Sequence, residues 1–244
     1  MHIFDLIKQY RAILVGMVFC FIFLWENIFP QKKIIGNFNH NIINLGYGAI
    51  NIIVSFGGGY FFSKYLDWIQ QNHFGILTFI PGTWSMIAGL LMADILMYWW
   101  HRMNHGNSFL WQFHSLHHED GQMNSTTAIR FHVMELILSF LFRIIFYSLF
   151  GINSMMLLIF STIHFIMIVF HHSNIYISKR IDHIIRIFVT SPLMHRIHHS
   201  DKWEETNSNY TSILSCWDWV FRSYVPHAKE EINFGVPKDI RCSN

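Results

Sequence analysis

Long apolar runs separated by short polar segments dominate the chain up to about residue 170. The runs at residues 12–29 and 42–62 are each close to the roughly 20 residues that a membrane-spanning helix needs. A third run covers residues 76–100 and holds a Pro-Gly pair near its start, so we expect its regular helix to begin at about Thr83. The pattern therefore predicts three membrane-spanning helices in this part of the chain.

Two further apolar runs predict a helical hairpin. They cover residues 133–150 and 152–170 and are separated only by Gly151, which suits two helices inserted from one face of the membrane. Glu135 and Arg143 lie in the first run, where an ionic side chain faces the protein interior or the interface rather than lipid. We therefore expect these two side chains to pack between helices or to support a nearby functional residue.

The number of spans predicts the orientation in the membrane. Three spans and then a hairpin place the polar segments after the third and fifth runs on one side. More basic residues fall on that side (Lys32, Lys33, Arg102, Arg130, Lys179, Arg180 and Arg186) than on the other (Lys8, Arg11 and Lys64). By the positive-inside rule, that side faces the cytoplasm. The prediction requires three complete early spans.

Composition agrees with a multi-pass integral membrane protein. Hydrophobic residues make up 52% of the chain and charged residues only 13%, which is too little charge to cover a water-exposed surface. The formal net charge of +2, with scattered Lys and Arg, argues against nucleic acid as a partner. The three cysteines (Cys20, Cys216 and Cys242) form no CxxC pair, which favours a reduced compartment and no chemical role.

We expect an all-α fold, a polytopic membrane helical bundle with a histidine-rich di-metal cap on the cytoplasmic side. Its predicted parts are N-terminal membrane helices at 1–75, a catalytic region with the membrane hairpin at 76–225, and a C-terminal tail at 226–244. We treat these parts as one structural domain, since no shift in composition separates them.

Histidine is the residue that stands out, with 17 in the chain. His101 and His105 lie four apart at the end of the third run, so their rings share one helix face. The sequence Gly-Asn-Ser at 106–108 is typical of a helix end followed by a cap, and it predicts a new helix from about Phe109. Ser-Pro at 191–192 predicts another helix start. Each new helix carries the pattern HxxHH on one face: His114, His117 and His118 in the first, and His195, His198 and His199 in the second.

These eight histidines predict a metal site, although an isolated histidine pair would more often be a polar packing contact. At helical spacing on one side of a membrane, they can hold two transition-metal ions with three to five nitrogen ligands each. The lack of clustered Cys argues against an iron–sulfur cluster, and the shortage of Glu argues against a carboxylate-bridged site. HHED and HHSD do not match HExxH, so a zinc peptidase is poorly supported.

Six segments between about residues 90 and 225 resemble the fatty acid hydroxylase superfamily, the sterol desaturase-like membrane di-iron oxygenases. In order they are ADILMYWWHRMNH, FLWQFHSLHHED, STTAIRFHVME, FHHSN, SPLMHRIHHSD and NYTSILSCWDWVF. The resemblance implies two iron ions held by His101, His105, His114, His117, His118, His132, His172, His195, His198 and His199. His171, beside His172, is left open.

The resemblance also bears on residues that do not bind metal. Asp94 matches the family's helix aspartate and would accept a hydrogen bond from a ligand imidazole; a role in helix packing or substrate access is the alternative. Two positions depart from the family pattern. Thr211 follows Asn-Tyr where the family usually has Gly, and Arg222-Ser223 follow Phe221 where it usually has Gly-Thr. Neither departure should affect metal binding, but both put the shape of the C-terminal part of the cap in doubt.

The resemblance implies an enzyme that hydroxylates or desaturates a lipid, such as a fatty acyl or sterol-like chain, with dioxygen and external electrons. We favour hydroxylation as the simpler outcome. The chain shows no nucleotide or flavin fingerprint, so we expect a separate donor, a ferredoxin or a b-type cytochrome reductase system. Its expected docking surface is basic, formed by Lys179, Arg180, Arg186 and Lys202.

Two other classes of function remain open at this point. A membrane metal-binding or metal-transport protein would have its ligands distributed along several spans at mid-membrane depth. A bis-histidine haem protein needs only pairs of histidines facing each other across a bundle, and it leaves the HxxHH triplets unexplained. The remaining histidines (His2, His40, His73, His164, His183 and His227) lack ligand spacing, and we expect surface or packing roles for them.

Overall fold

The fold is described for residues 3–34 and 37–237 of a computed structural model. Within these ranges the regular elements are helices, and three isolated β-bridges form between the segments that connect or follow them. In chain order they are α1 (Ile3–Ile28), α2 (Asn37–Gln71), the 3-10 helix η1 (Ile76–Phe79), α3 (Gly82–Gly106), α4 (Ser108–His118), the 3-10 helix η2 (Ser125–Ile129), α5 (Val133–Phe150), α6 (Ser154–His172), α7 (Lys179–Phe188), α8 (Pro192–His198), α9 (Trp203–Thr206) and α10 (Cys216–Val220).

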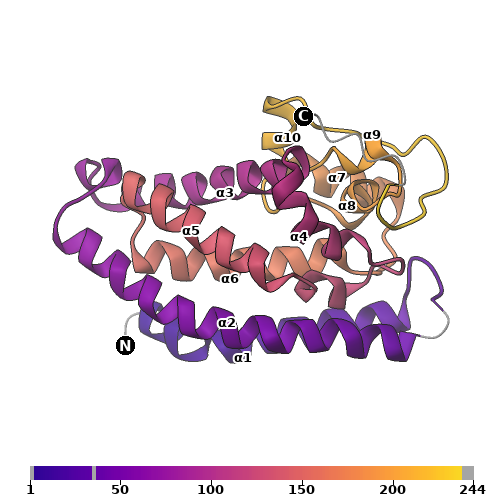
Figure 1. The fold of residues 1–244 in the computed structure, drawn as a ribbon, viewed down its shortest axis with the longest axis horizontal. Helices are drawn as coiled ribbons and strands as arrows, with labels where there is room; N and C mark the ends of the chain where they lie inside the picture. The colour runs from indigo at the N-terminus through magenta and orange to yellow at the C-terminus, as the bar shows by residue number, and fades with distance from the viewer. Residues whose placement is uncertain (1–2, 35–36, 238–244) are drawn as a thin grey trace.

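Five long helices form the bundle. In Figure 1, α1 and α2 form one layer, and α3, α5 and α6 lie over it along the same long axis. Helix α1 packs on α6, α2 packs on α5 and α6, and α3 packs on α5 and α6. The short helices α7 to α10 gather at one end, which we call the cap end (Figure 1). Helices α1, α3 and α6 all finish toward this end.

Four helices are long and apolar enough to cross a membrane, which confirms the predicted all-α membrane bundle. The candidate spans are Leu6–Ile28, Phe38–Gln71, Val133–Phe150 and Ser154–His172. Helix α3 lies along the same axis in Figure 1 but is not among these four. It carries buried Asp94 and, near its end, buried Asn104 and His105.

The predicted hairpin forms with a tight reversal at Gly151. Helix α5 ends at Phe150, and Gly151 adopts the left-handed conformation, with φ 76°, that favours glycine. The Asn153 side chain then accepts a hydrogen bond from the Met156 amide and caps α6. Gly75 passes close to this turn, since a Cβ there would lie 2.2 Å from the Gly151 nitrogen.

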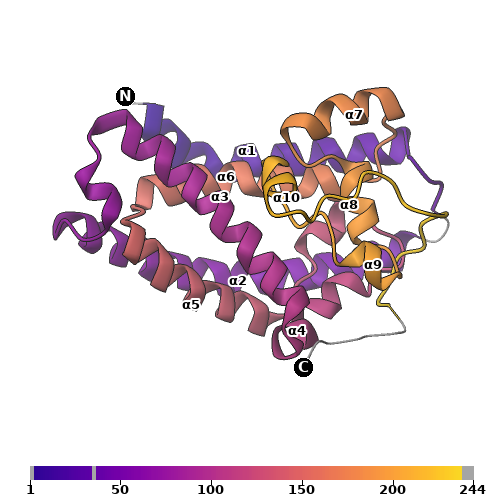
Figure 2. The same cartoon turned by 90° about the horizontal axis from the view of Figure 1, so that it is seen from above.

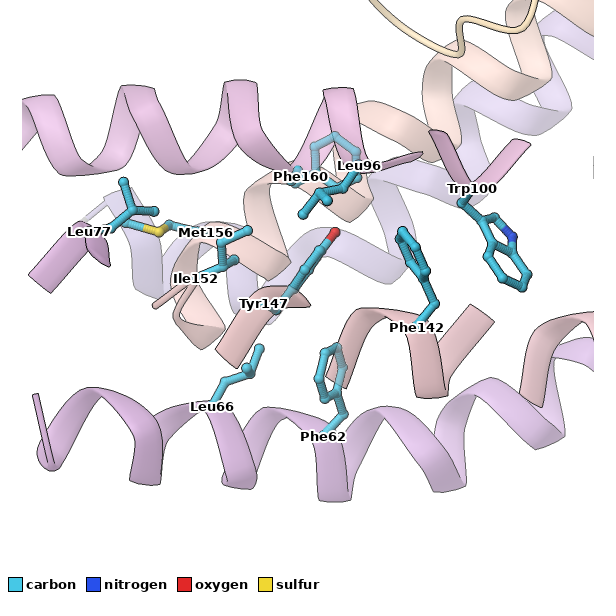
Figure 3. Close-up of a cluster of buried hydrophobic side chains, with 11 residues drawn as sticks. Phe62, Leu66, Leu77, Leu96, Trp100, Phe142, Tyr147, Ile152, Met156 and Phe160 are labelled. Carbon is cyan, nitrogen blue, oxygen red and sulfur yellow. The ribbon is translucent and has the colours of Figure 1, made fainter. Parts of the chain in front are cut away.

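An apolar core joins the long helices away from the cap end. Figure 3 shows Tyr147 and Phe142 of α5 between residues of α2, α3 and α6. The Trp100 and Phe142 rings have centroids 5.2 Å apart, and those of Phe62 and Tyr147 are 5.9 Å apart. Because lipid tails are as apolar as this core, close van der Waals packing is what favours these contacts in a membrane.

The helix boundaries near the histidines agree with the sequence signals. Helix α3 begins at Gly82, one residue before the expected start. The Asn107 side chain accepts hydrogen bonds from two amides of α4, and the Ser191 side chain accepts one from Met194 in α8. The division into 1–75, 76–225 and 226–244 stays a prediction. His2 and Cys242 lie outside the described residues.

Candidate metal centre

Nine of the ten predicted ligands come together at the cap end as two groups. Within each group, one nitrogen from every imidazole lies within 4.8 Å of all the others. The five-histidine group is His101, His105, His114, His118 and His198, and the four-histidine group is His117, His172, His195 and His199. The groups are adjacent, because the ring centroids of His118 and His199 are 4.3 Å apart.

Each HxxHH triplet contributes to both groups. In α4, His114 and His118 belong to the five-histidine group, whereas His117 belongs to the other. In α8 the division is reversed, because His195 and the following His199 join the four-histidine group and His198 joins the five. On a helix, the first and last histidines of HxxHH are four residues apart and lie one above the other, whereas the middle histidine points to one side of them. One helix can therefore contribute to two neighbouring groups.

The five-histidine group contains two imidazoles that point unprotonated nitrogens at each other. His101 donates its Nδ1 hydrogen to the Tyr210 carbonyl at 2.7 Å, and His198 donates its Nδ1 hydrogen to the Ser208 carbonyl at 2.7 Å. A neutral imidazole that donates from Nδ1 carries a lone pair on Nε2. The two Nε2 atoms nevertheless lie 3.0 Å apart. A cation between them fits this geometry, whereas no hydrogen bond can form between two lone pairs.

The four-histidine group contains the same arrangement. His117 donates from Nδ1 to the Arg130 carbonyl at 3.2 Å, and His172 donates from Nδ1 to the Ile168 carbonyl at 2.7 Å. Their Nε2 atoms are 3.0 Å apart. Two nitrogens about 2.1 Å from one ion and at right angles around it would be about 3.0 Å apart, so this separation suits two ligands of the same ion.

Several other imidazole nitrogens in the groups are buried without a partner among the described residues. They are Nε2 of His114 and His118, Nδ1 of His195, and both nitrogens of His105 and His199. A buried polar atom without a hydrogen bond is costly, and metal ligation satisfies such an atom. Desolvation by burial lowers the pKa of His198 to about 3 and holds the pKa of His117 and His199 well below the usual value. These three rings are therefore neutral near pH 7, the form that binds metal.

The C-terminal part of the cap holds the carbonyl that orients His101. The buried Asp218 carboxylate accepts hydrogen bonds from the Tyr210 amide at 2.9 Å, from the Thr211 amide and hydroxyl, and from the Ser223 hydroxyl at 2.6 Å. This network fixes Tyr210, whose carbonyl accepts from His101. The Trp-Asp motif thus acts on the metal centre through a neighbouring backbone.

Both departures from the family pattern have a physical explanation in this network. Thr211 supplies an extra hydroxyl to Asp218, and Ser223 supplies the hydroxyl that a threonine would otherwise offer. Arg222 adopts φ 58°, the left-handed region that favours glycine, which accounts for the family's usual glycine at this position. An arginine in this conformation is strained.

Asp94 lies on α3, where it contacts the C-terminal part of the cap. Its carboxylate accepts a hydrogen bond from the Trp217 indole at 2.8 Å and another from the Leu214 amide at 3.2 Å. Among the described residues, these two are its hydrogen-bond donors, and neither is an imidazole. These bonds favour a packing role that joins α3 to α10 and to the segment before it.

Glu135 is the carboxylate that supports a histidine. It lies at the start of α5, is buried, and accepts a hydrogen bond from His114 Nδ1 at 2.9 Å. This bond leaves His114 Nε2 free to face the five-histidine group. The sequence indicated a packing or supporting role for Glu135, but it did not identify the histidine.

Sequence reasoning missed Glu26 of α1, a buried side chain that supports the four-histidine side of the centre. Its carboxylate accepts hydrogen bonds from the Ser125 amide and hydroxyl and from the Asn174 amide at 2.8 Å. Asn174 follows His172 by two residues, and its side-chain oxygen accepts from Arg196, the neighbour of His195. The only sequence signal was a charged residue at the end of an apolar run.

A second missed network ties α2 to the segment between α4 and α5. Asp120 is paired with His40 at 2.6 Å and accepts hydrogen bonds from Asn44 and Thr127. Although burial opposes it, these hydrogen bonds hold the pKa of Asp120 well below its usual value. The network fixes η2, which leads directly to Arg130 and its carbonyl contact with His117. His40, expected at the surface or in packing, is therefore part of a polar network.

Two histidines considered as ligands lie outside both groups. The His132 side chain accepts a hydrogen bond from the Met134 amide at 3.1 Å and caps α5, and its ring packs near Phe113. His171 packs on His195, with ring centroids 4.1 Å apart, and its Nδ1 is buried without a partner among the described residues. Metal ligation by His132 stays a prediction, and its side chain already has another role as the N-cap of α5.

The expected basic docking surface is not present as predicted. Arg186 is buried, forms an ion pair with Asp182 one turn earlier, and donates to the Pro226 carbonyl. Lys202 forms an ion pair with Glu230 at 2.7 Å. Only Lys179 and Arg180 of the four remain exposed without an ion pair among the described residues. The prediction was wrong for Arg186 because Asp182 neutralises it inside the cap.

The geometry thus defines a membrane protein with a histidine-rich site that could hold metal. The fatty acid hydroxylase family model matches residues 86–223, a range that contains all nine grouped histidines. The chain belongs to the fatty acid hydroxylase family.

Curated relatives share part of their length with this chain. The ornithine lipid hydroxylase OlsE of Rhizobium tropici is 32% identical over 150 residues, which cover 60% of this chain and 44% of that protein. The alkylglycerol monooxygenases of Homo sapiens and Xenopus tropicalis are 25% and 28% identical, over 64% and 66% of this chain and 34% of each of theirs. The chain therefore spans less than half the length of these relatives. No solved structure matches significantly.

Proposed function

We propose that this protein is a membrane-bound di-iron oxygenase that hydroxylates a lipid chain. The observation that supports it most is the pair of adjacent histidine groups, in each of which two imidazoles point unprotonated nitrogens at each other. Membership of the family adds support, since its relatives here are named as a lipid hydroxylase and monooxygenases. The reaction would use dioxygen, external electrons and protons, and yield a hydroxylated lipid and water.

Each histidine group would hold one iron ion. Iron at the two groups would supply the redox chemistry that activates dioxygen. The imidazoles would provide the lone pairs, and the carbonyls that accept from Nδ1 of His101, His117, His172 and His198 would keep each Nε2 aimed at the site. Because nearly all of the grouped rings are buried, they would also keep bulk water from the reacting atoms.

The proposed substrate is the hydrocarbon chain of a membrane lipid. Three of the grouped histidines, His101, His105 and His172, lie in the last turns of α3 and α6, so the site is at the end of these long helices. A lipid chain could approach it from the bilayer without passing through water. Hydroxylation remains our preferred outcome, and desaturation is the related alternative.

The central test is metal content with a defined requirement for electrons. Protein purified under anaerobic conditions with ferrous iron should hold close to two irons per chain. It should leave lipid unchanged with dioxygen alone and hydroxylate it once a ferredoxin or cytochrome reductase system is added. One metal per chain, or full turnover without a reductant, would contradict the proposal.

Metal transport and haem binding are the competing functions. The histidines gather at one end of the bundle instead of following the spans, which favours an enzyme over a transport path. A haem protein would show an intense Soret absorption band, so an absorption spectrum of the iron-loaded protein separates this alternative from a non-haem centre.

We further propose that the metal centre faces the cytoplasm. The end of α1, the start of α2 and the helices that carry the histidine groups lie at the same end of the bundle. The predicted three early spans require this arrangement, provided that α3 also crosses the membrane. Tags at the C-terminus and beside Ser178 should be accessible only from the cytoplasm. Labelling of either tag by an impermeant reagent added outside the cell would show that the centre faces the opposite side of the membrane.

A further inference from the structure

Helix α7 turns an apolar face away from the protein. Ile181, Ile184 and Ile187 are 54%, 53% and 49% exposed, and Phe188 at its end is 67% exposed. These residues share one side of the helix by their spacing of three and four. A water-exposed helix normally has the opposite pattern, so this face requires an apolar environment.

The ionic side chains of α7 that are buried lie on the opposite side. Asp182 and Arg186 pair across one turn, Asp182 also accepts from the Leu193 amide, and Arg186 donates to the Pro226 carbonyl. Both side chains are therefore held by contacts inside the cap, although Arg186 Nε is buried without a partner among the described residues. Since a rotation of α7 would break all of these contacts, its isoleucines are fixed in the outward position.

The connection into α7 places it at the level where membrane helices end. Helix α7 begins seven residues after the last residue of α6. In the connection between them, Ile175 forms a β-bridge with Pro30, which lies two residues after the end of α1. Figures 1 and 2 show α7 level with the cap-side end of α1 along the long axis, and Figure 2 shows it on the flank of the molecule. The outward face thus continues the lipid-facing surface of the bundle.

A neighbouring segment extends this surface. The Ser215 amide donates to the Phe188 carbonyl, which brings α10 to the end of α7. On α10, Trp219 and Val220 are 54% and 63% exposed. At the other end of α7, Lys179 and Arg180 are exposed in its first turn, close to the Ile175 and Pro30 bridge.

We propose that the outward face of α7 lies in the lipid bilayer, with Lys179 and Arg180 at anionic head groups. Amphipathic helices with an apolar face and flanking basic residues bind bilayer interfaces in this way. Residues 189–191 connect α7 directly to α8 and its histidines, so the bilayer would hold one wall of the metal centre at a fixed depth. Membrane contact at this face is independent of the reaction proposed for the metal centre.

The exposed chemistry favours lipid over a soluble electron carrier. A carrier of the expected acidic kind is recognised by basic side chains, but the outward face of α7 is mainly isoleucine and Phe188. Its buried arginine is already neutralised by Asp182. Docking of a carrier on this face is therefore the alternative that the experiment must separate.

The test is a depth measurement on the full chain in vesicles. In a background with the native cysteines changed to serine, Ile184→Cys would carry a polarity-sensitive fluorophore. Glu204→Cys is the control, because Glu204 is exposed on the cap and its side chain is 75% accessible. We expect lipids brominated in the acyl chain to quench the label at residue 184 and aqueous iodide to quench the label at residue 204. Iodide quenching of the label at residue 184 in vesicles would overturn the proposal. If an added electron carrier then protected this label from iodide, the face would be a carrier docking surface instead.

A second measurement tests the head-group contact. Vesicles of phosphatidylcholine with phosphatidylglycerol should give stronger lipid quenching at residue 184 than vesicles of phosphatidylcholine alone. The difference should disappear when Lys179→Gln and Arg180→Gln are combined. An unchanged dependence on phosphatidylglycerol in this double variant would refute the role of the two basic residues. Iron content does not enter either measurement, so failure here leaves the proposed oxygenase testable by itself.

Discussion

The two histidine groups are built from similar parts but are supported differently. In the five-histidine group, a carboxylate contacts one ring directly, since Glu135 accepts from His114. In the four-histidine group, the hydrogen bonds that orient His117 and His172 go to backbone carbonyls. The first group thus has a carboxylate at one of its histidine rings, and the orientation of these two rings in the second depends on the course of the backbone around them.

This difference shows how the N-terminal helices contribute to the centre. The backbone around His117 and His172 is held by Glu26 of α1 and by the network of His40 and Asn44 on α2. Both helices lie outside residues 86–223, the range of the family model. Helices that could be taken for simple membrane anchors therefore support one of the two groups.

Removing one imidazole from each group should have the largest effect. We expect His118→Ala and His199→Ala each to lose about one of two bound irons and most of the activity, because no neighbouring group replaces the lost nitrogen. The loss should be more complete for His199, whose group falls to three histidines, than for His118, whose group keeps four. Iron per chain, measured by mass spectrometry, checks this. His227→Ala is the control, and equal iron content in the His199 and His227 variants would contradict the assignment.

Replacing the charged partner should affect only the five-histidine group. Glu135→Gln keeps the size of the side chain but removes the negative charge beside His114, and loss of such a partner typically weakens metal affinity about 10- to 100-fold. Competition with a chelator should release one of the two irons at a lower chelator concentration than in the parent protein. Release of both irons together would show that Glu135 supports the whole cap instead of one group.

Weakening the α1 contact should affect the four-histidine group more mildly. Glu26→Gln removes one of the acceptor oxygens shared by Ser125 and Asn174, and an unsatisfied buried group costs about 1–3 kcal/mol. We expect a lower melting temperature and selective weakening of the second iron. Asn27→Gln is a matched control at the neighbouring, exposed position. Equal effects of the Glu26 and Asn27 variants would show that Glu26 has no specific role in supporting the four-histidine group.

Changing His132 should give the smallest effect. Since its side chain caps α5, His132→Ala should cost about 1 kcal/mol or less of stability and leave both irons bound. His132→Asn should restore the cap. Loss of an iron in both variants would instead establish His132 as a ligand, as the family resemblance implies.

Local sequence patterns predicted much of the fold and the clustering of eight histidines, and the family resemblance added His172; metal ligation by these residues stays a prediction. The apolar runs give α1, α2, α5 and α6, and the cap signals give the starts of α4 and α8. The spacing of the histidines could not assign them to two groups, because that division depends on how α4 and α8 pack together. Contacts such as Glu26 with Ser125, which are 99 residues apart, have no local signal.

The same limit applies to single positions in the cap. Arg186 looked exposed in the sequence because it follows Lys and Arg in a polar segment, and its pairing with Asp182 shows only in the folded helix. Asp94 was expected either to accept from a ligand imidazole or to pack between helices, and its hydrogen bonds to Trp217 and Leu214 come from another part of the chain. In both cases the partner was set by tertiary packing.

The division of each HxxHH triplet between the two groups has a consequence for assembly. Because α4 and α8 each carry histidines of both groups, a rotation of either helix changes the geometry of both groups at once. An ion bound at one group would fix the rotation of the helices and preorganise the other, so metal uptake is expected to be positively cooperative. In the parent protein, chains with a single ion should then be fewer than two independent sites would give, whereas a variant that has lost one group still binds one ion at the other.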